Sequence, residues 1–422
     1  MNVKGTRDFL PEEMILRQQV LEKIRKVFET FSFQPLEASA LESWEVLSAK
    51  GAGGEEILNE TYNFEDKGGR RIGLRYDLTV PLARVIAENP NLPLPFKRYQ
   101  IEKVWRYGDI AKGKLREFLQ SDIDIVGSES SLADAEVIAC AIECFNALGF
   151  KKFIVRLNNR KTLTDILKLS KVSEEKITDT LRTIDKLDKI GVDNVKKELE
   201  EKGISSASIK RIIDFIEVRG ENEKVLKQIE KLDGVKELKE IISCLKTMKL
   251  DSKVKIDLSL ARGLDYYTGP IFEVFAEEGI GSVAGGGRYD KMIGLFLGRD
   301  VPATGISLGI ERIMEVMKER KMIDSKSKTR VFVVAVNDEV RDKVLEIVQM
   351  LREESIATDY DLRFRTLSKQ LEYVNSLGIP FVVIVGEKEL EKNSVKLRNM
   401  KTGKEELVKI NDLVKKFSYK VL

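Results

Sequence analysis

The chain has 422 residues, of which 42% are hydrophobic and 33% charged, and its formal net charge is +3. These values are typical of a globular protein with two or three domains, and no apolar run approaches the roughly 20 residues of a membrane span. The chain contains no histidine. This excludes Ser-His-Asp hydrolases, Cys-His proteases and His-ligated zinc sites, so catalysis must use other side chains, substrate groups or a carboxylate-bound metal.

The first residues, MNVKGTRDFLPEE, have no apolar core and no small-residue cleavage site. We therefore expect no secretory signal and a cytoplasmic location. Cys140 and Cys144 lie four residues apart in an apolar helical stretch. They could be half of a metal site, but two buried small side chains on one helix face are the stronger expectation, and we expect no structural metal.

The first zone, residues 1 to about 160, alternates helical and extended patterns. Helical spacing predicts helices at residues 17–31 and 133–149, the second ended by Gly149. Residues 61–77 predict two strands around an Asp-Lys-Gly-Gly turn. Residues 115–127 predict a strand, and its two-residue period places Phe118, Gln120, Asp122 and Asp124 on one face.

Two further zones follow. Residues 163–250 carry Lys, Glu, Leu and Ile at helical spacing and predict several amphipathic helices, after which strand and glycine signals return. The helical zone therefore looks like an insertion. From about residue 328, strand and helix patterns alternate, which predicts a small α/β domain with parallel pairing. Residues 391–420 hold nine Lys or Arg against four Asp or Glu, a basic end compatible with a polyanionic partner or with a solvated face.

Four arginines in the strand-rich regions are candidates for binding a nucleoside triphosphate. Arginine binds phosphate oxygens in a bidentate manner and can stabilise charge that develops at phosphorus. A surface ion pair is the commoner role for any one arginine, so the prediction depends on the whole set. Phe118 could stack on a purine. The four arginines are Arg106, Arg116, Arg262 and Arg312.

Several segments of the sequence resemble the motifs of one protein family. WRYGDIAKGKLREFLQSDIDIVG resembles motif 2 of class II aminoacyl-tRNA synthetases, and ATGISLGIERI resembles motif 3. LARGLDYYTGPIFEVF resembles the histidine-specific loop of histidyl-tRNA synthetases, and the resemblance extends over nearly the whole chain. It implies an α+β catalytic domain with an antiparallel sheet flanked by helices, at residues 1–325. It also implies a helical insertion at 163–250 and a C-terminal α/β anticodon-binding domain at 328–422.

The resemblance also implies roles for individual residues. Arg106 would hold the α-phosphate and the amino-acid carboxylate, Arg312 the γ-phosphate, and Arg262 the α-phosphate during adenylate formation. Arg262 and Arg106 would be the catalytic residues. ATP would be bound by Arg106, Arg116, Phe118 and Arg312. Histidine would be bound by Asp77, Thr79 and Gln120 at its α-amino group, by Asp124 and Tyr267 at its ring nitrogens, and by Arg262 and Tyr266.

The implied activity is ATP-dependent ligation of histidine to tRNA(His), with Mg²⁺ accompanying ATP, in a homodimer. The substrate carboxylate attacks the α-phosphate, so no histidine base is required. The alternative is a non-catalytic regulatory relative in histidine biosynthesis. Such relatives usually lack the C-terminal domain and the catalytic arginines.

The chain departs from the family pattern at three positions: Gly108 replaces the motif 2 glutamate, Ser39 a motif 1 proline, and Lys114 a frequent arginine. Individual residues also have purely structural alternatives. Tyr266 and Tyr267 could be core aromatics, and Asp122 and Asp124 could be solvated carboxylates. The glycines at 285–287 could serve only a bulge or a close backbone approach.

Overall fold

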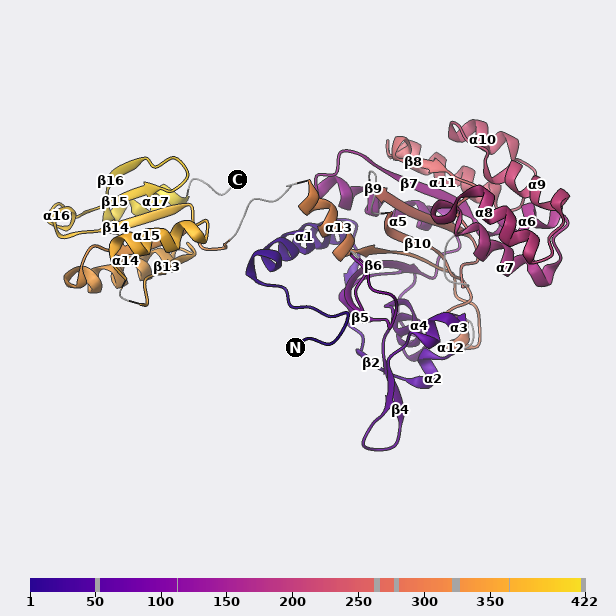
Figure 1. Cartoon of the computed structure of the whole chain (residues 1–422), viewed down its shortest axis with the longest axis horizontal. Helices are drawn as coiled ribbons and strands as arrows, with labels where there is room; N and C mark the ends of the chain where they lie inside the picture. The colour runs from indigo at the N-terminus through magenta and orange to yellow at the C-terminus, as the bar shows by residue number, and fades with distance from the viewer. Residues whose placement is uncertain are drawn as a thin grey trace. The chain divides into compact units, whose positions relative to one another are not determined.

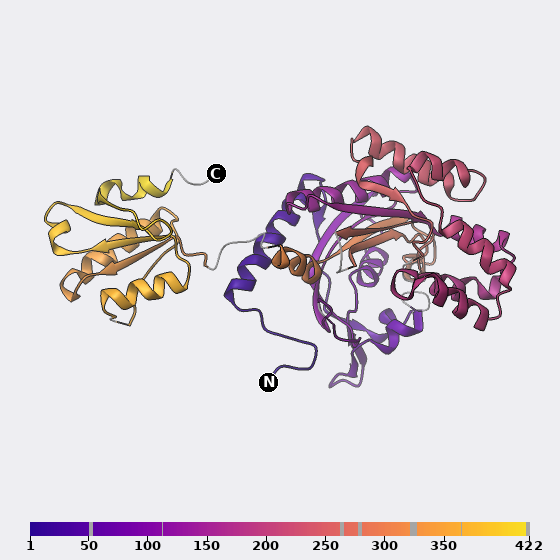
Figure 2. The same ribbon diagram turned by 45° about the horizontal axis from the view of Figure 1, so that its top comes forward.

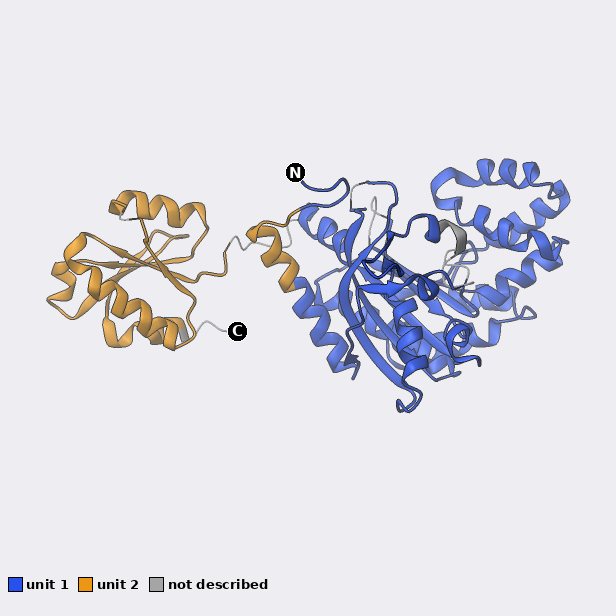
Figure 3. Cartoon of the chain, turned by 90° about the horizontal axis from the view of Figure 1, so that it is seen from below, with its two compact units in different colours: residues 1–7, 20–320 blue, residues 8–19, 321–422 orange. Residues whose placement is uncertain are grey.

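The computed structural model describes residues 1–49, 54–111, 113–261, 266–276, 281–320, 327–363 and 365–418. The chain divides into two compact units (Figure 3). Unit 1 comprises residues 1–7 and 20–320, and unit 2 comprises residues 8–19 and 321–422. The first helix, α1 (Pro11–Thr30), contributes to both units. Across the described ranges, none of the helices has the length and apolar character needed to cross a membrane.

Unit 1 is built on an eight-stranded sheet in the order β1-β5-β6-β11-β10-β9-β7-β8 (Figures 1 and 2). The six central strands are antiparallel, and β1 and β8 pair in parallel at the two edges. The predicted strand at 115–127 and the antiparallel sheet are confirmed. The strands are β1 Gln34–Pro35, β5 Phe96–Trp105, β6 Glu117–Val126, β7 Phe153–Asn159, β8 Val254–Ile256, β9 Pro270–Ala276, β10 Ser282–Arg288 and β11 Ala303–Gly309.

One face of this sheet is covered by helices. Phe28 of α1 contacts Tyr99 of β5 with ring centroids 5.7 Å apart. Asp134 of α5 (Ser131–Ala147) binds Arg288 of β10 at 2.6 Å. Helix α5 is buried almost all round, which is why both of its cysteines are buried core residues, as predicted. It is followed by Gly149 at φ 87°, a backbone conformation that favours glycine.

The helical zone is confirmed as a set of amphipathic helices. The apolar sides of the first four of these helices meet in a buried cluster that includes Leu181, Val195 and Ile212, while their charged sides face solvent. Helix α11 also packs on α5. The helices are α6 Arg160–Leu169, α7 Glu174–Ile184, α8 Leu187–Glu201, α9 Ser206–Ile216, α10 Asn222–Gln228 and α11 Val235–Thr247.

A three-stranded sheet, β2-β4-β3, contains the predicted hairpin. In its turn, Asp66 Oδ1 accepts hydrogen bonds from the backbone N–H groups of Gly68 at 2.8 Å and Arg70 at 2.9 Å. The strands are β2 Leu41–Ser43, β3 Asn63–Glu65 and β4 Arg71–Leu74. The remaining helices of unit 1 are α2 Trp44–Leu47, α3 Gly54–Asn59, α4 Thr79–Glu88, α12 Gly294–Leu297 and α13 Ile310–Glu319.

Unit 2 contains a five-stranded sheet in the order β13-β12-β14-β15-β16. The predicted parallel pairing is confirmed for β12 with β13 and with β14, whereas β15 and β16 add an antiparallel hairpin. Apolar residues of α14 and α17 pack on one face and those of α15 on the other. The elements are β12 Val331–Ala335, α14 Arg341–Glu353, β13 Thr358–Tyr360, α15 Leu367–Ser376, β14 Phe381–Val385, α16 Glu387–Leu390, β15 Ser394–Asn399, β16 Glu405–Lys409 and α17 Leu413–Ser418.

Candidate active site

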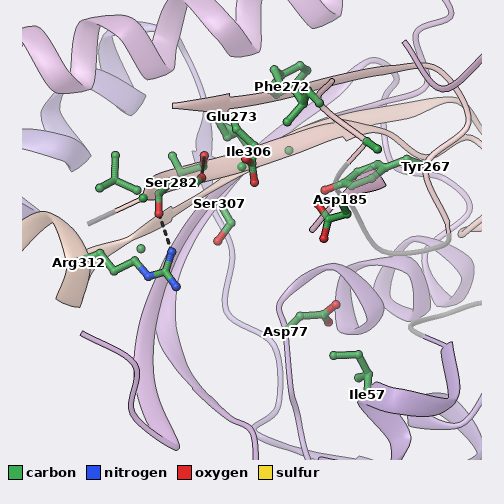
Figure 4. A pocket seen from close by; sticks show the side chains of 18 of the residues that line it. Ile57, Asp77, Asp185, Tyr267, Phe272, Glu273, Ser282, Ile306, Ser307 and Arg312 are labelled. Atoms are coloured by element: carbon green, nitrogen blue, oxygen red, sulfur yellow. Dashed lines mark hydrogen bonds between the residues drawn. The ribbon is translucent and has the colours of Figure 1, made fainter. Parts of the chain in front are cut away.

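A cavity of about 1690 Å³ lies in unit 1, over the sheet face opposite α5. The two-residue period of β6 directs Gln120, Asp122 and Asp124 into it, as predicted. In Figure 4, Arg312 lies at one end of this space and Tyr267 at the other, with Ser307 between them. Nine of the predicted residues line the cavity: Asp77, Thr79, Arg106, Phe118, Gln120, Asp124, Tyr266, Tyr267 and Arg312. Arg262 lies outside the described residues.

Glycines make room for the buried acids. A Cβ on Gly305 would lie 2.0 Å from Asp124 Oδ1, and a Cβ on Gly286 would lie 2.0 Å from the Gly305 carbonyl oxygen. The close backbone approach considered for residues 285–287 is therefore present. Gly285 and Gly305 also leave the space above the sheet open, because a side chain at either position would project toward Glu273 or Asp124.

Asp124 is a buried carboxylate rather than a solvated one, with 3% of its surface exposed. Arg98 Nη2 lies 2.7 Å from Asp124 Oδ2, and the Tyr289 hydroxyl donates a hydrogen bond to Oδ1. Burial raises the pKa of Asp124, whereas Arg98 and Tyr289 favour its charged form. The two partners therefore fix the direction in which this carboxylate faces the cavity.

Arg98 was not predicted as a site residue, although it is the most important cation beneath the site. It is completely buried, and its guanidinium also donates to the Leu78 carbonyl oxygen at 3.1 Å. The segment FKRYQIEKVW holds four charged residues, so nothing in the sequence singles out Arg98. Strand pairing places Arg98 beside the site, because it is the direct partner of Asp124 between β5 and β6.

The proposed α-amino contacts lie on two different elements. Asp77 precedes α4 and accepts the Val80 backbone N–H at 3.1 Å through Oδ1, while its Oδ2 is buried without a hydrogen-bond partner. Burial raises the pKa of Asp77 to about 6. Gln120 Nε2 donates to Ser307 Oγ at 2.7 Å, which leaves Gln120 Oε1 as a second buried acceptor without a partner.

Three tyrosines form an aromatic wall. The ring centroids of Tyr266 and Tyr267 are 4.8 Å apart, and those of Tyr266 and Tyr289 are 5.9 Å apart. Burial raises the pKa of Tyr266 and Tyr267, so both remain protonated and can act as hydrogen-bond donors. Tyr266 and Tyr267 pack against apolar residues and also line the cavity. They can therefore be core aromatics and binding residues at once.

The arginines lie in three different environments. Arg106 donates through Nε to the Tyr76 carbonyl oxygen at 2.8 Å, and its guanidinium carbon lies 5.4 Å from the Phe118 ring centroid. Arg312 Nη1 donates to the Ser282 carbonyl oxygen at 2.7 Å, as Figure 4 shows. Arg116 is not among the residues that line the cavity; its guanidinium carbon lies 3.6 Å from the centroid of the Tyr107 ring.

The departures from the family pattern have local explanations. A Cβ on Gly108 would lie 2.9 Å from Glu60 Oε1, so the Glu60 carboxylate occupies the space beside this position and also lines the cavity. Ser39 Oγ donates to the Leu41 carbonyl oxygen at 2.7 Å. Lys114 lines the cavity, so its position retains a cation.

Several other cavity-lining residues had no predicted role, among them Ser307, Tyr289, Glu311 and Asp122. Ser307 falls within the motif ATGISLGIERI and Tyr289 directly follows β10, but only the tertiary structure brings them to Gln120 and Asp124. Glu311 accepts the Leu119 backbone N–H at 3.1 Å. Asp122, which appeared in the strand period without a role, is also buried.

Replacing Tyr289 with phenylalanine removes a hydrogen bond to a buried carboxylate. We expect KM for histidine, the amino acid that the sequence resemblance implies, to rise about tenfold, since such bonds contribute about 1.5–3 kcal/mol, with a smaller change in kcat. The measurement is histidine-dependent pyrophosphate exchange. Tyr99→Phe is the matched control, because the Tyr99 hydroxyl donates to Glu29 at 3.0 Å on the other face of the sheet. Equal KM values for the two variants would contradict a role for Tyr289.

Known proteins resemble this chain over nearly its whole length. A family model described as histidyl-tRNA synthetase matches residues 5–313, and one described as anticodon binding domain matches residues 330–420. The histidine–tRNA ligase of Aeropyrum pernix is 43% identical, covering 98% of this chain and 96% of its own. Histidine–tRNA ligase 1 of Bacillus cereus is 40% identical, covering 98% of both. The crystal structure of histidyl-tRNA synthetase from Nostoc sp. PCC 7120 superimposes with a TM-score of 0.88 at 33% identity, covering 100% of this chain and 99% of that one. The chain belongs to the histidyl-tRNA synthetase family.

Proposed function

We propose that this chain is a histidine–tRNA ligase. It activates histidine with ATP to histidyl-adenylate and pyrophosphate, and then transfers the histidyl group to tRNA(His). The observation that carries the proposal is the cavity of unit 1, whose lining combines buried carboxylates with arginines. Carboxylates suit the cationic groups of an amino acid, and arginines suit phosphates.

In the proposed mechanism, the amino acid lies over β6. Asp77, Thr79 and Gln120 receive its α-ammonium group, for which Asp77 Oδ2 and Gln120 Oε1 are buried acceptors without partners. Asp124 and Tyr267 receive the ring nitrogens. A ligand that left these polar groups unsatisfied would bind poorly, and this gives the pocket its selectivity.

The arginines act on the nucleotide. Arg106 holds the substrate carboxylate and the α-phosphate, Arg312 holds the γ-phosphate, and Phe118 stacks on the adenine. The carboxylate oxygen attacks the α-phosphorus, the bond to the bridging oxygen breaks, and pyrophosphate leaves with the electron pair. No proton transfer is required, so positioning and charge neutralisation supply the catalysis. Arg262 is proposed to act on the same phosphate, and Arg116 to assist from outside the cavity wall.

Further assignments belong to the same proposal. ATP enters as its Mg²⁺ complex. Residues 1–325 form the catalytic domain with the insertion at 163–250, and residues 328–422 bind the anticodon. The active form is a homodimer in the cytoplasm. Sedimentation equilibrium of the full chain tests the dimer, and a monomer at working concentration would contradict it.

The test of the proposed function is pyrophosphate exchange into ATP with each of the twenty amino acids. We expect exchange with histidine and none above background with the other nineteen. Aminoacylation of a tRNA(His) transcript then tests the transfer step. A folded chain that gives no exchange with any amino acid would instead support a non-catalytic regulatory subunit.

A further inference from the structure

Three acceptor oxygens in the wall of the cavity are buried and have no hydrogen-bond partner among the residues that the structure describes. They are Asp77 Oδ2, Gln120 Oε1 and Asp122 Oδ1. A buried acceptor without a donor is costly, so a cavity lined with three of them is built for a ligand that brings several donors. The proposed mechanism uses the first two for the α-ammonium group and leaves Asp122 unexplained.

Asp122 lies in the wall of the cavity. It is 3% exposed, lines the cavity, and falls on β6 between Gln120 and Asp124. Its partners across the sheet are Gln100 on β5 and Ser307 on β11. It is therefore directed at the space between the groups proposed to hold the α-ammonium group and those proposed to hold the ring.

Among the residues that the structure describes, negative charge exceeds positive charge around Asp122. The groups that act on it are Arg98 of β5, Asp124 of β6, Asp77 before α4 and the Ser307 hydroxyl of β11. Glu273 of β9 lies on the same face and has a partner of its own. Among the described residues, Asp77, Asp122 and Asp124 share the buried guanidinium of Arg98, and Arg106 also acts on Asp77.

Binding of the amino acid changes this balance. Its α-carboxylate is matched by Arg106, and its α-ammonium group neutralises one of the three acids. One buried negative charge then remains beside the ring. An uncompensated charge in such a place is strongly unfavourable, and a cationic ring would compensate it.

We propose that Asp122 is a specificity-determining residue that, together with Asp124, makes the pocket take histidine with its ring protonated. The proposal rests on the proposed function. An imidazolium donates from both nitrogens, whereas a neutral imidazole donates from one. The protonated ring therefore satisfies both the missing charge and the missing donor. Burial raises the pKa of Asp122 to about 7 in the empty site, which agrees with a carboxylate that lacks a cation there.

The proposal predicts proton uptake on binding. At about pH 8, the ring of free histidine is mostly neutral, and Asp122 is mostly ionised. Isothermal titration of histidine into the full chain, in two buffers of different ionisation enthalpy, should show uptake of about one proton per site. Asp122→Asn should reduce the uptake to near zero. The control Asp214→Asn changes an exposed carboxylate on α9 and should leave the uptake unchanged.

A second measurement uses the wild-type chain and does not depend on the variant folding. Triazolylalanine has the shape of histidine, but its ring stays uncharged near neutral pH. Wild type should activate it far less well than histidine in pyrophosphate exchange, and Asp122→Asn should reduce that discrimination about tenfold or more.

The outcomes separate the two proposals. Histidine exchange by the wild type without proton uptake, or with equal use of triazolylalanine, would overturn the role of Asp122 and leave the proposed function intact. Absence of histidine exchange by the wild type would overturn the proposed function itself, and the role of Asp122 with it.

Discussion

Replacing Arg106 with alanine should lower kcat for histidine-dependent pyrophosphate exchange by about 10²- to 10³-fold, the usual effect of removing one donor aimed at developing charge. Arg106 donates to the Tyr76 carbonyl oxygen and lies against the Phe118 ring, so its guanidinium is held in place before any substrate binds. A preorganised cation costs little reorganisation during the reaction. The measurement is exchange under saturating ATP and histidine.

Two comparisons make the Arg106 result specific. Arg71→Ala is the matched control, because Arg71 also lies against an aromatic ring, Trp44, but is exposed and does not line the cavity. Its rate should match the wild type. Arg106→Lys keeps the charge but loses the fork, so it should recover only part of the activity. Wild-type exchange by Arg106→Ala would remove Arg106 from the mechanism.

Replacing Arg98 with methionine should lower the free energy of unfolding by about 3–5 kcal/mol at neutral pH, since it leaves buried carboxylates without their cation. Arg98 is completely buried and lies 2.7 Å from Asp124. The neighbouring Lys97→Met is the control. Lys97 also forms an ion pair at 2.7 Å, with Glu136, but both side chains are partly exposed. Lys97→Met should lower the free energy of unfolding by less than about 1 kcal/mol.

The loss of unfolding free energy in Arg98→Met should depend on pH in a defined direction. Removing the guanidinium raises the pKa of Asp124 and Asp122 in the folded chain further above the unfolded value of about 3.9. A folded state that binds more protons than the unfolded state loses stability as pH rises. The loss should therefore be smallest in acid, where these carboxyls are protonated with or without Arg98, and should grow as pH rises through and above about 7, the wild-type pKa of Asp122. Chemical denaturation at several pH values measures it, and adding Asp124→Asn should recover part of the loss. A deficit that is the same at all pH values would contradict the electrostatic explanation.

The sequence alone determined many of the elements and nine of the residues that line the cavity. The two-residue period of β6 placed Gln120, Asp122 and Asp124 on one face, and helical spacing identified the insertion as amphipathic helices. Both patterns are local, because they follow from backbone geometry and the burial of one face. The motifs identified nine cavity-lining residues, since a motif records which side chains a reaction requires.

Only the tertiary structure decided how the site is held and charged. Arg98 and Tyr289 stand 26 and 165 residues from Asp124 in the sequence, and they reach its carboxylate only through the register of the sheet and the backbone after β10. Arg116 carries the same charge as Arg106, yet it lies outside the cavity wall. The excess of buried negative charge beside Asp122 is likewise invisible in a chain whose net charge is +3. Burial and electrostatic balance depend on which distant side chains are brought together and on which water is removed, and a linear pattern encodes neither.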